Sequence, residues 1–153
     1  MTSLQDKLFA LQDKQYAALQ AKLTPGVPDH CFIGIRVPVL RTFAKEYIKD
    51  MAYMDFLKQL PHTYYDENML HGLLIAEIRN YETCIRLTDA FLPHIDNWAV
   101  CDIMAPKIFA KHKQDLLTKI QSWTQSSHIY TCRFGIKMLM SVSYTHLTLP
   151  TIA

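Results

Sequence analysis

The sequence predicts an all-α protein, a solenoid of stacked helical hairpins, on three observations. Nearly every segment of the 153 residues repeats its apolar residues with helical period, and almost none alternates as a strand does. Prolines mark most of the breaks between these segments. Similar side chains recur at intervals of 30 and 31 residues, which indicates a repeated unit.

The apolar periodicity predicts eight helical segments in order. Pro38 lies in the first turn of the second segment, where the missing N–H of proline does no harm. Pro106 lies inside the sixth segment and should kink or split that helix. The predicted segments are 4–22, 38–50, 53–60, 66–79, 82–92, 97–109, 113–124 and 128–140.

Three of these helices superimpose if Asp66, Asp96 and Ser127 are taken as their N-caps. Second helices, 82–92 and 113–124, lie between them, so the repeat is a helical hairpin. Stacked short hairpins form a superhelix with a concave inner surface. The residues five, nine and twelve positions after each cap form the expected apolar stripes: His71, Cys101 and Cys132; Ile75, Ala105 and Ile136; Ile78, Ile108 and Leu139.

The composition is that of one folded domain with a sizeable core. Half of the residues are hydrophobic, 20% are charged and only four are glycine. The four cysteines are scattered and no hydrophobic leader is present, so we expect reduced thiols and a cytoplasmic protein. No apolar run is long enough to span a membrane. The histidines have no metal-ligand spacing, so we predict no metal and no cofactor.

The charges are unevenly distributed along the chain. Residues 1–49 carry seven basic and four acidic residues, 50–102 carry three and nine, and 103–153 carry six and one. The balances are +3, −6 and +5, which sum to the net charge of +2. The basic last third fits a polyanionic partner, or simply a solvated helix face.

Trp98 and Asp102 are the most informative pair of side chains. They lie four residues apart on one predicted helix, so an aromatic face and a carboxylate can meet one bound group. The same pair also fits a packing tryptophan beside a solvated aspartate. The repeat places Gly72, Asp102 and Arg133 six residues after each cap, where Gly72 would leave room. Asp102 and Arg133 would then face one ligand together, or pair with each other across the repeat interface.

Four segments, in order over about residues 5–141, resemble the AlkD-type DNA alkylation repair glycosylases, which are built from HEAT-like helical repeats. The resemblance implies an incomplete solenoid of this class, with residues 1–141 as the glycosylase domain. The segments are 33–41 (IGIRVPVLR), 66–67 (DE) with 71–76 (HGLLIA), 97–102 (NWAVCD) and 133–139 (RFGIKML).

This resemblance implies a monofunctional alkylpurine DNA glycosylase of base-excision repair, a hydrolase that releases N3- or N7-alkylated purines such as 3-methyladenine and 7-methylguanine. An alkylated purine is a cationic leaving group, so one carboxylate suffices without a strong general acid. Asp102 would stabilise positive charge on the deoxyribose and position the attacking water. Trp98 would lie against the sugar.

The resemblance also implies a monomer that binds double-stranded DNA containing alkylated bases, without flipping the damaged base. Arg133 matches an arginine that contacts the DNA backbone beside the lesion, and Lys137 one turn later would assist. Arg36 and Arg41 are expected either near a phosphate of the N-terminal repeat or in capping and surface roles. The alternative function is a non-catalytic helical-repeat scaffold that binds DNA or protein.

The family pattern ends near the C-terminus of the chain. Residues 138–153 contain no Lys, Arg, Asp or Glu, and the helical stripe stops after Ser141. We expect residues 142–153 to be a non-native, adapter-like tail on a truncated domain that lacks further repeats and a second clamping tryptophan. Because a solenoid needs a capping repeat, we expect this chain to be poorly stable and to have reduced or no activity.

Overall fold

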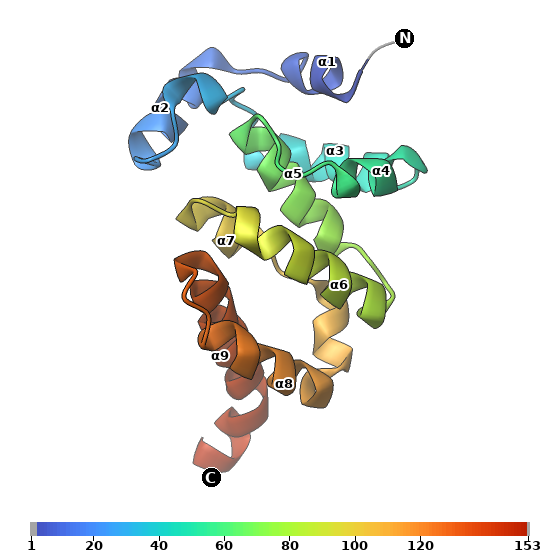
Figure 1. Ribbon diagram of the computed structural model, residues 1–153, viewed down its shortest axis with the longest axis vertical. Helices are drawn as coiled ribbons and strands as arrows, with labels where there is room; N and C mark the ends of the chain where they lie inside the picture. Colours follow the sequence, from blue (N-terminus) through green and yellow to red (C-terminus); the bar gives the residue numbers. More distant parts are fainter. Residues whose placement is uncertain (1–2, 153) are drawn as a thin grey trace.

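The protein is a stack of short α-helices (Figure 1). A computed structural model describes residues 3–152, with side chains described for residues 3–143. The α-helices are α1 (Leu4–Phe9), α2 (Lys14–Leu23), α3 (Val37–Tyr47), α4 (Ala52–Lys58), α5 (Tyr65–Ala76), α6 (Tyr81–Phe91), α7 (Trp98–Ile103), α8 (Lys113–Thr124) and α9 (Ile129–Ile152). Three short 3-10 helices are η1 (Asp29–Cys31), η2 (Leu92–His94) and η3 (Lys107–Lys111).

Each hairpin of the stack packs on the next one along the chain. Helices α3, α5, α7 and α9 contact one another in turn, while α6 packs against α5 and α8 packs against α9. The short helix η3 contacts both α6 and α8. With no strand among the described residues, the predicted all-α helical-repeat solenoid is confirmed.

Proline and the caps decide where the helices end. The predicted helix 97–109 is split as expected, because α7 ends at Ile103 and the chain passes extended through Met104 and Pro106 before η3. Helix α8 has the predicted bounds of 113–124. At the C-terminal end the prediction was wrong, since α9 continues past residue 140 to Ile152.

The predicted N-terminal helix 4–22 is two helices, and Asp13 is the reason. Its side chain accepts the Tyr16 N–H at 3.1 Å and thereby caps α2. Its own backbone N–H donates to the Gly34 carbonyl at 2.7 Å. Because that N–H turns to a distant loop, α1 cannot continue into α2.

The three predicted N-caps are wrong, although the helices begin close to them. Asn97, not Asp96, caps α7 by accepting the Val100 N–H at 3.0 Å. Likewise α9 begins after His128, whose Nδ1 accepts the Thr131 N–H at 3.2 Å, and not after Ser127. The 31-residue interval between Asn97 and His128 nevertheless equals the predicted one.

Asp66 lies inside α5 and holds a different segment. Its carboxylate is 2% exposed and accepts the backbone N–H groups of Ile33 (2.7 Å), Gly34 (3.4 Å) and Ile35 (2.9 Å). Burial raises the pKa of Asp66, while these three backbone donors oppose that rise. The carboxylate therefore fixes the loop before α3 onto the start of α5.

Comparable polar links recur along the stack at separations of about one repeat. Lys107 of η3 pairs with Glu77 after α5, and Lys119 of α8 pairs with Asp89 of α6, both at 2.6 Å. The Trp123 indole donates to the same Asp89 at 2.8 Å. Each link joins residues 30 to 34 positions apart, so each fixes one hairpin onto its neighbour.

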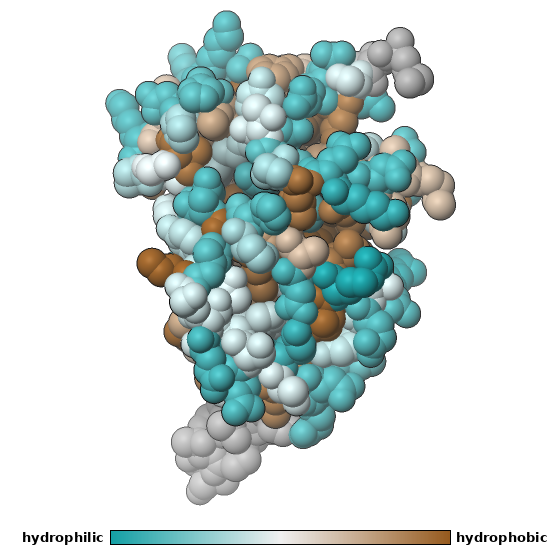
Figure 2. Space-filling view, viewed as in Figure 1, coloured by the Kyte–Doolittle hydropathy of each residue, from teal (hydrophilic) through white to brown (hydrophobic). Residues whose placement is uncertain are grey.

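The apolar stripes are confirmed in α5 and shifted in α9. His71 and Ile75 are fully buried, whereas Ile136 and Leu139 are 47% and 41% exposed. The buried side of α9 is formed by Phe134, with Met138 and Val142 one and two turns later. Hydrophilic residues cover most of the face in Figure 2, and apolar residues show between them.

Among the described residues, no helix combines the length and apolarity that crossing a membrane requires. The origin of residues 142–153 stays a prediction. Their backbone is helical up to Ile152, and the side chains of residues 144–153 lie outside the described part of the chain.

The buried His71 and the half-buried His62 form a polar pair inside an aromatic cluster. Their ring nitrogens, Nδ1 of His71 and Nε2 of His62, lie 2.8 Å apart, and the His71 ring stacks on Phe91 at 4.0 Å between centroids. Nε2 of His71 has no hydrogen-bond partner in the described part of the chain. Burial lowers the pKa of His71 to about 3 and that of His62 to about 4. Both rings are therefore neutral in the folded protein at neutral pH.

Substitution of Gly34 should destabilise the fold strongly. Gly34 has φ +92°, and a Cβ there would lie 2.3 Å from the Asp13 carbonyl oxygen. We expect Gly34→Ala to lower the free energy of unfolding by about 3–5 kcal/mol, from left-handed strain plus overpacking. Gly26→Ala is the matched control, because Gly26 has φ +98° but open space around it, and should cost only about 1–2 kcal/mol. Equal losses in urea unfolding would contradict the close contact.

The histidine pair should make stability depend on pH. Because the pKa of His71 is lower in the folded than in the unfolded protein, unfolding takes up a proton below about pH 6.5. Stability is full above that pH and falls as pH decreases toward 4. We expect His71→Phe to remove roughly 1 kcal/mol per pH unit of this slope between pH 6.5 and 4.5.

Urea unfolding at several pH values measures the slope, with His30→Gln as control at an exposed histidine of η1. A slope that His71→Phe leaves unchanged would show that His71 does not titrate with unfolding.

Candidate functional site

Helix α7 presents Trp98 and Asp102 on one exposed face. The helix has only six residues, from Trp98 to Ile103, and Asn97 caps its first turn. Residues four apart lie above one another on a helix surface. The Trp98 residue is 46% exposed and the Asp102 side chain 35% exposed, so neither is buried in the core. Both side chains are partly exposed to solvent.

The indole of Trp98 is tethered at one edge. Its Nε1–H donates to the carbonyl of Leu23, the last residue of α2, at 3.3 Å. A hydrogen bond at the ring edge leaves the π-face free. The ring is therefore oriented by a segment 75 residues away in the sequence.

Asp102 and Arg133 form a two-pronged ion pair between α7 and α9. Nε of Arg133 donates to Oδ1 at 2.8 Å, and Nη2 donates to Oδ2 at 2.7 Å. The hydrogen bonds from Arg133 hold the pKa of Asp102 below its usual range, and the carboxylate raises the pKa of Arg133 in turn. The sequence left open whether these groups face a ligand or pair with each other. They pair here, at the position where the repeat brings them together.

Lys137 binds the backbone of the same residue. Its ammonium donates to the backbone carbonyl of Asp102 and, at 3.2 Å, to that of Met104. Burial lowers the pKa of Lys137, and the charge of Asp102 opposes that shift. Lys137 was expected beside a DNA phosphate. In the unbound protein its ammonium already has two hydrogen-bond partners, both backbone carbonyls.

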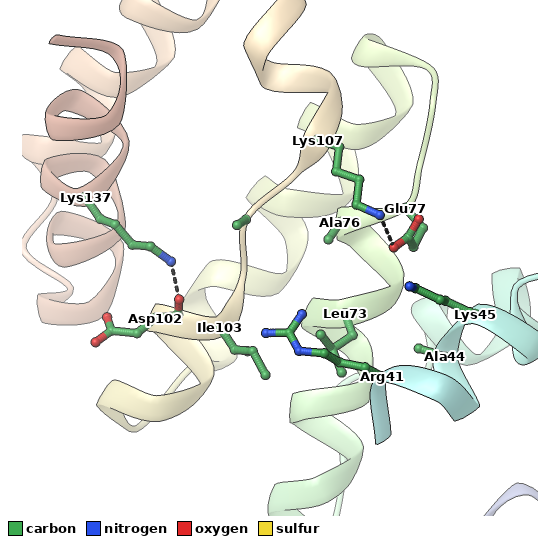
Figure 3. A pocket seen from close by; sticks show the side chains of 11 residues that line it. Arg41, Ala44, Lys45, Leu73, Ala76, Glu77, Asp102, Ile103, Lys107 and Lys137 are labelled. Atoms are coloured by element: carbon green, nitrogen blue, oxygen red, sulfur yellow. Dashed lines mark hydrogen bonds and ion pairs between the residues drawn. The ribbon is translucent and has the colours of Figure 1, made fainter. Parts of the chain in front are cut away.

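A cleft of about 380 Å³ opens beside Asp102, between α3, α5, α7 and α9 (Figure 3). Four of its lining residues are basic and two are acidic, so its walls carry a net positive charge. Figure 3 shows Arg41 reaching from α3 toward Ile103 of α7. The lining residues are Arg41, Ala44, Lys45, Leu73, Ala76, Glu77, Asp102, Ile103, Ala105, Lys107 and Lys137.

A second hollow, of about 440 Å³, lies on the other side of Asp102. It is lined by Asp102, Arg133, Ile136, Lys137 and Met140. Because Asp102 and Lys137 line both hollows, they form the ridge between them. The exposed parts of Ile136 and Met140 make this side more apolar than the cleft.

Arg36 is not brought to this cleft. It precedes α3, pairs with Asp13 at 3.1 Å and lies over the Tyr16 ring at 4.9 Å. Its neighbour in the sequence motif, Arg41, is the arginine that lines the cleft. Of the expected DNA-binding residues, Arg133 and Lys137 lie together with Asp102, and Arg36 lies apart.

Gly72 does not leave open space beside the site, which corrects the expectation. A Cβ at Gly72 would meet Ile103 and Met104 at 3.7 and 3.6 Å, which is ordinary packing distance. A methyl group would fit at this position, so the packing of α5 against the end of α7 does not require a glycine.

Sequence reasoning missed Lys45, Glu77 and the cleft position of Lys107. Lys45 lies one turn after Arg41 on α3, a spacing that carries a signal for one basic face. Lys107 reaches the cleft because α7 ends early before Pro106, and it pairs there with Glu77. For Glu77 the sequence holds no such signal.

A basic cleft lined by an acidic side chain, with an exposed tryptophan on the same helix as that carboxylate, defines on a helical-repeat stack a class of proteins suited to bind a polyanion. A family model described as DNA alkylation repair enzyme matches residues 4–148. The chain belongs to this family of DNA alkylation repair enzymes. Its role is thus the repair of alkylated DNA, with DNA as the partner. Comparisons with curated proteins and with solved structures give no match.

The ion pair between Asp102 and Arg133 should contribute only modestly to stability. The Arg133 side chain is 48% exposed, so solvent screens the pair. Its two-pronged geometry nevertheless favours a coupling energy at the upper end of the range for exposed ion pairs. In a double-mutant cycle of Asp102→Asn and Arg133→Gln, we expect a coupling of about 0.5–1 kcal/mol in the free energy of unfolding.

The matched control is the pair of Glu46 and Lys49, which are more exposed and make one contact at 3.4 Å. We expect no measurable coupling there. A coupling at Asp102 and Arg133 as small as in the control would contradict the two-pronged geometry.

Proposed function

We propose that the protein is a monofunctional DNA glycosylase that hydrolyses the N-glycosidic bond of N3- or N7-alkylated purines in duplex DNA. The observation that carries the proposal is the exposed pair of Trp98 and Asp102 on α7, of which Asp102 lines a basic cleft. An ionised carboxylate repels DNA phosphates, so a protein that only binds DNA gains from Asp102 nothing beyond its ion pair with Arg133.

The chemistry requires one carboxylate. Water adds its oxygen to C1′ of the deoxyribose, and the C1′–N bond breaks with its electron pair leaving on the purine. That purine leaves as a neutral base, since alkylation had made it cationic, and the water proton passes to Asp102 or to solvent. The Asp102 carboxylate, whose pKa lies below its usual range in the unbound protein, stabilises the positive charge that builds up on the sugar.

Trp98 would supply a second stabilising surface. An electron-rich aromatic face attracts cationic character in a sugar lying against it. The exposed indole, fixed at its edge by the Leu23 carbonyl, suits that role. Neither contact requires the base to leave the duplex.

The composition of the cleft supports catalysis on a stacked base. Its described lining contains no aromatic side chain that would sandwich an extruded purine. Its free cations instead suit phosphates. Arg41 in the cleft forms no ion pair with another described residue. Arg133 lines the second hollow and has a guanidinium fork shaped for a phosphate once it leaves Asp102.

The absence of lyase action is supported by Lys137, the lysine nearest Asp102. A lysine nucleophile must present a free amine to C1′. The Lys137 ammonium donates to two backbone carbonyls instead.

One observation favours a non-catalytic scaffold as the second candidate. Both carboxylate oxygens of Asp102 are engaged by Arg133, so they are not free for a sugar or a water in the unbound protein. The glycosylase proposal therefore requires a DNA phosphate to compete for Arg133.

Base release from methylated duplex DNA tests the proposal. We expect the protein to release 7-methylguanine or 3-methyladenine, and Asp102→Asn to lower the single-turnover rate by about 100-fold or more, the size of one electrostatic contact to a transition state. Asp115→Asn, at an exposed aspartate of α8, is the matched control and should keep the full rate.

Retained DNA binding would show that Asp102→Asn is folded. Binding of alkylated DNA without any base release by the unaltered protein would favour the scaffold.

A further inference from the structure

The C-terminal end of α7 lacks the usual partners for its carbonyls. Met104, which follows the helix, is extended with ψ 108°, so the chain leaves without a closing turn. Pro106, two residues later, has no N–H to donate. The last carbonyl groups of a helix need donors from elsewhere when the following turn supplies none.

Lys137 supplies those donors from the next repeat. Its ammonium, one turn after Arg133 on α9, donates to the carbonyls of Asp102 and Met104. A cation at this position also balances the negative end of the helix dipole. The side chain is half-buried and in place before any DNA is present.

The position of Asp102 makes this support necessary. Asp102 lies in the last turn of α7, where a carboxylate is repelled by the helix dipole. Arg133 balances the side chain and Lys137 holds the backbone of the same residue. If Arg133 turns to a phosphate, Lys137 is the cation that still fixes Asp102.

We propose that Lys137 is a positioning residue, which holds the backbone of Asp102 for catalysis and does not contact a DNA phosphate. This inference rests on the proposed glycosylase function and replaces the expectation that Lys137 binds the DNA backbone. Its two carbonyl bonds, together with its place on the ridge between the two hollows, carry the inference.

Lys137→Met tests the role, because methionine keeps an unbranched apolar stem but no donor. We expect hydrogen exchange at residues 98–104 to become at least tenfold faster, with exchange in α8 unchanged. The single-turnover rate of 7-methylguanine release should fall about tenfold or more at saturating DNA. The salt dependence of DNA binding should stay unchanged, whereas loss of a phosphate contact lowers its log–log slope by about 0.9.

Lys45→Met is the matched control and should show the opposite pattern. Lys45 lines the cleft without an ion pair to another described residue. Its loss should reduce the affinity and salt slope for DNA and leave exchange in α7 unchanged. Lys137→Arg, which restores charge and donors, should recover part of the rate.

Unchanged exchange at residues 98–104 in Lys137→Met would overturn the inference. So would a lower salt slope with a normal rate, or trapping of Lys137 on an abasic site by borohydride. If Lys137→Met unfolds, Lys137→Gln, which keeps an uncharged donor, carries the same comparison. The exchange measurement needs no DNA, so it decides the role of Lys137 in holding α7 even if the unaltered protein releases no base.

Discussion

Each hairpin of this chain is fixed to the next by acidic side chains that reach across the joint. In a solenoid, each repeat is stabilised mainly by its neighbours, so the angle at every joint must be set locally. Asp66 holds the loop before α3, Asp89 holds α8, and Asp102 holds α9. The stack keeps its shape because these links recur at about one repeat length.

These links differ in strength because they differ in burial. Asp66 is almost fully enclosed, and its loss would leave three backbone donors unsatisfied inside the core. Asp102 and Arg133 lie at the surface, where an ion pair is worth about 1 kcal/mol or less and a phosphate can replace the carboxylate. The buried link made by Asp66 therefore lies away from the cleft, and the exposed ion pair of Asp102 and Arg133 lies beside it.

The sequence predicts the stack and the proximity of Asp102 to Arg133. Both α7 and α9 begin one residue later than predicted, so the predicted interval between them is unchanged. The sequence wrongly predicts Asp66 as a helix cap, because a capping carboxylate and a buried carboxylate both accept hydrogen bonds from backbone N–H groups. The hydrogen-bond donors to Asp66 lie in an irregular loop, which hydrophobic periodicity does not predict. The cleft also depends on where α7 stops, because this brings Lys107 into its lining beside Glu77.

The hydrogen bond from the Trp98 indole to the Leu23 carbonyl joins α7 to the end of α2. An indole has a single N–H, so a movement of the ring away from Leu23 leaves that donor without this partner. The orientation of the exposed tryptophan is thereby coupled to the placement of the last turn of α2.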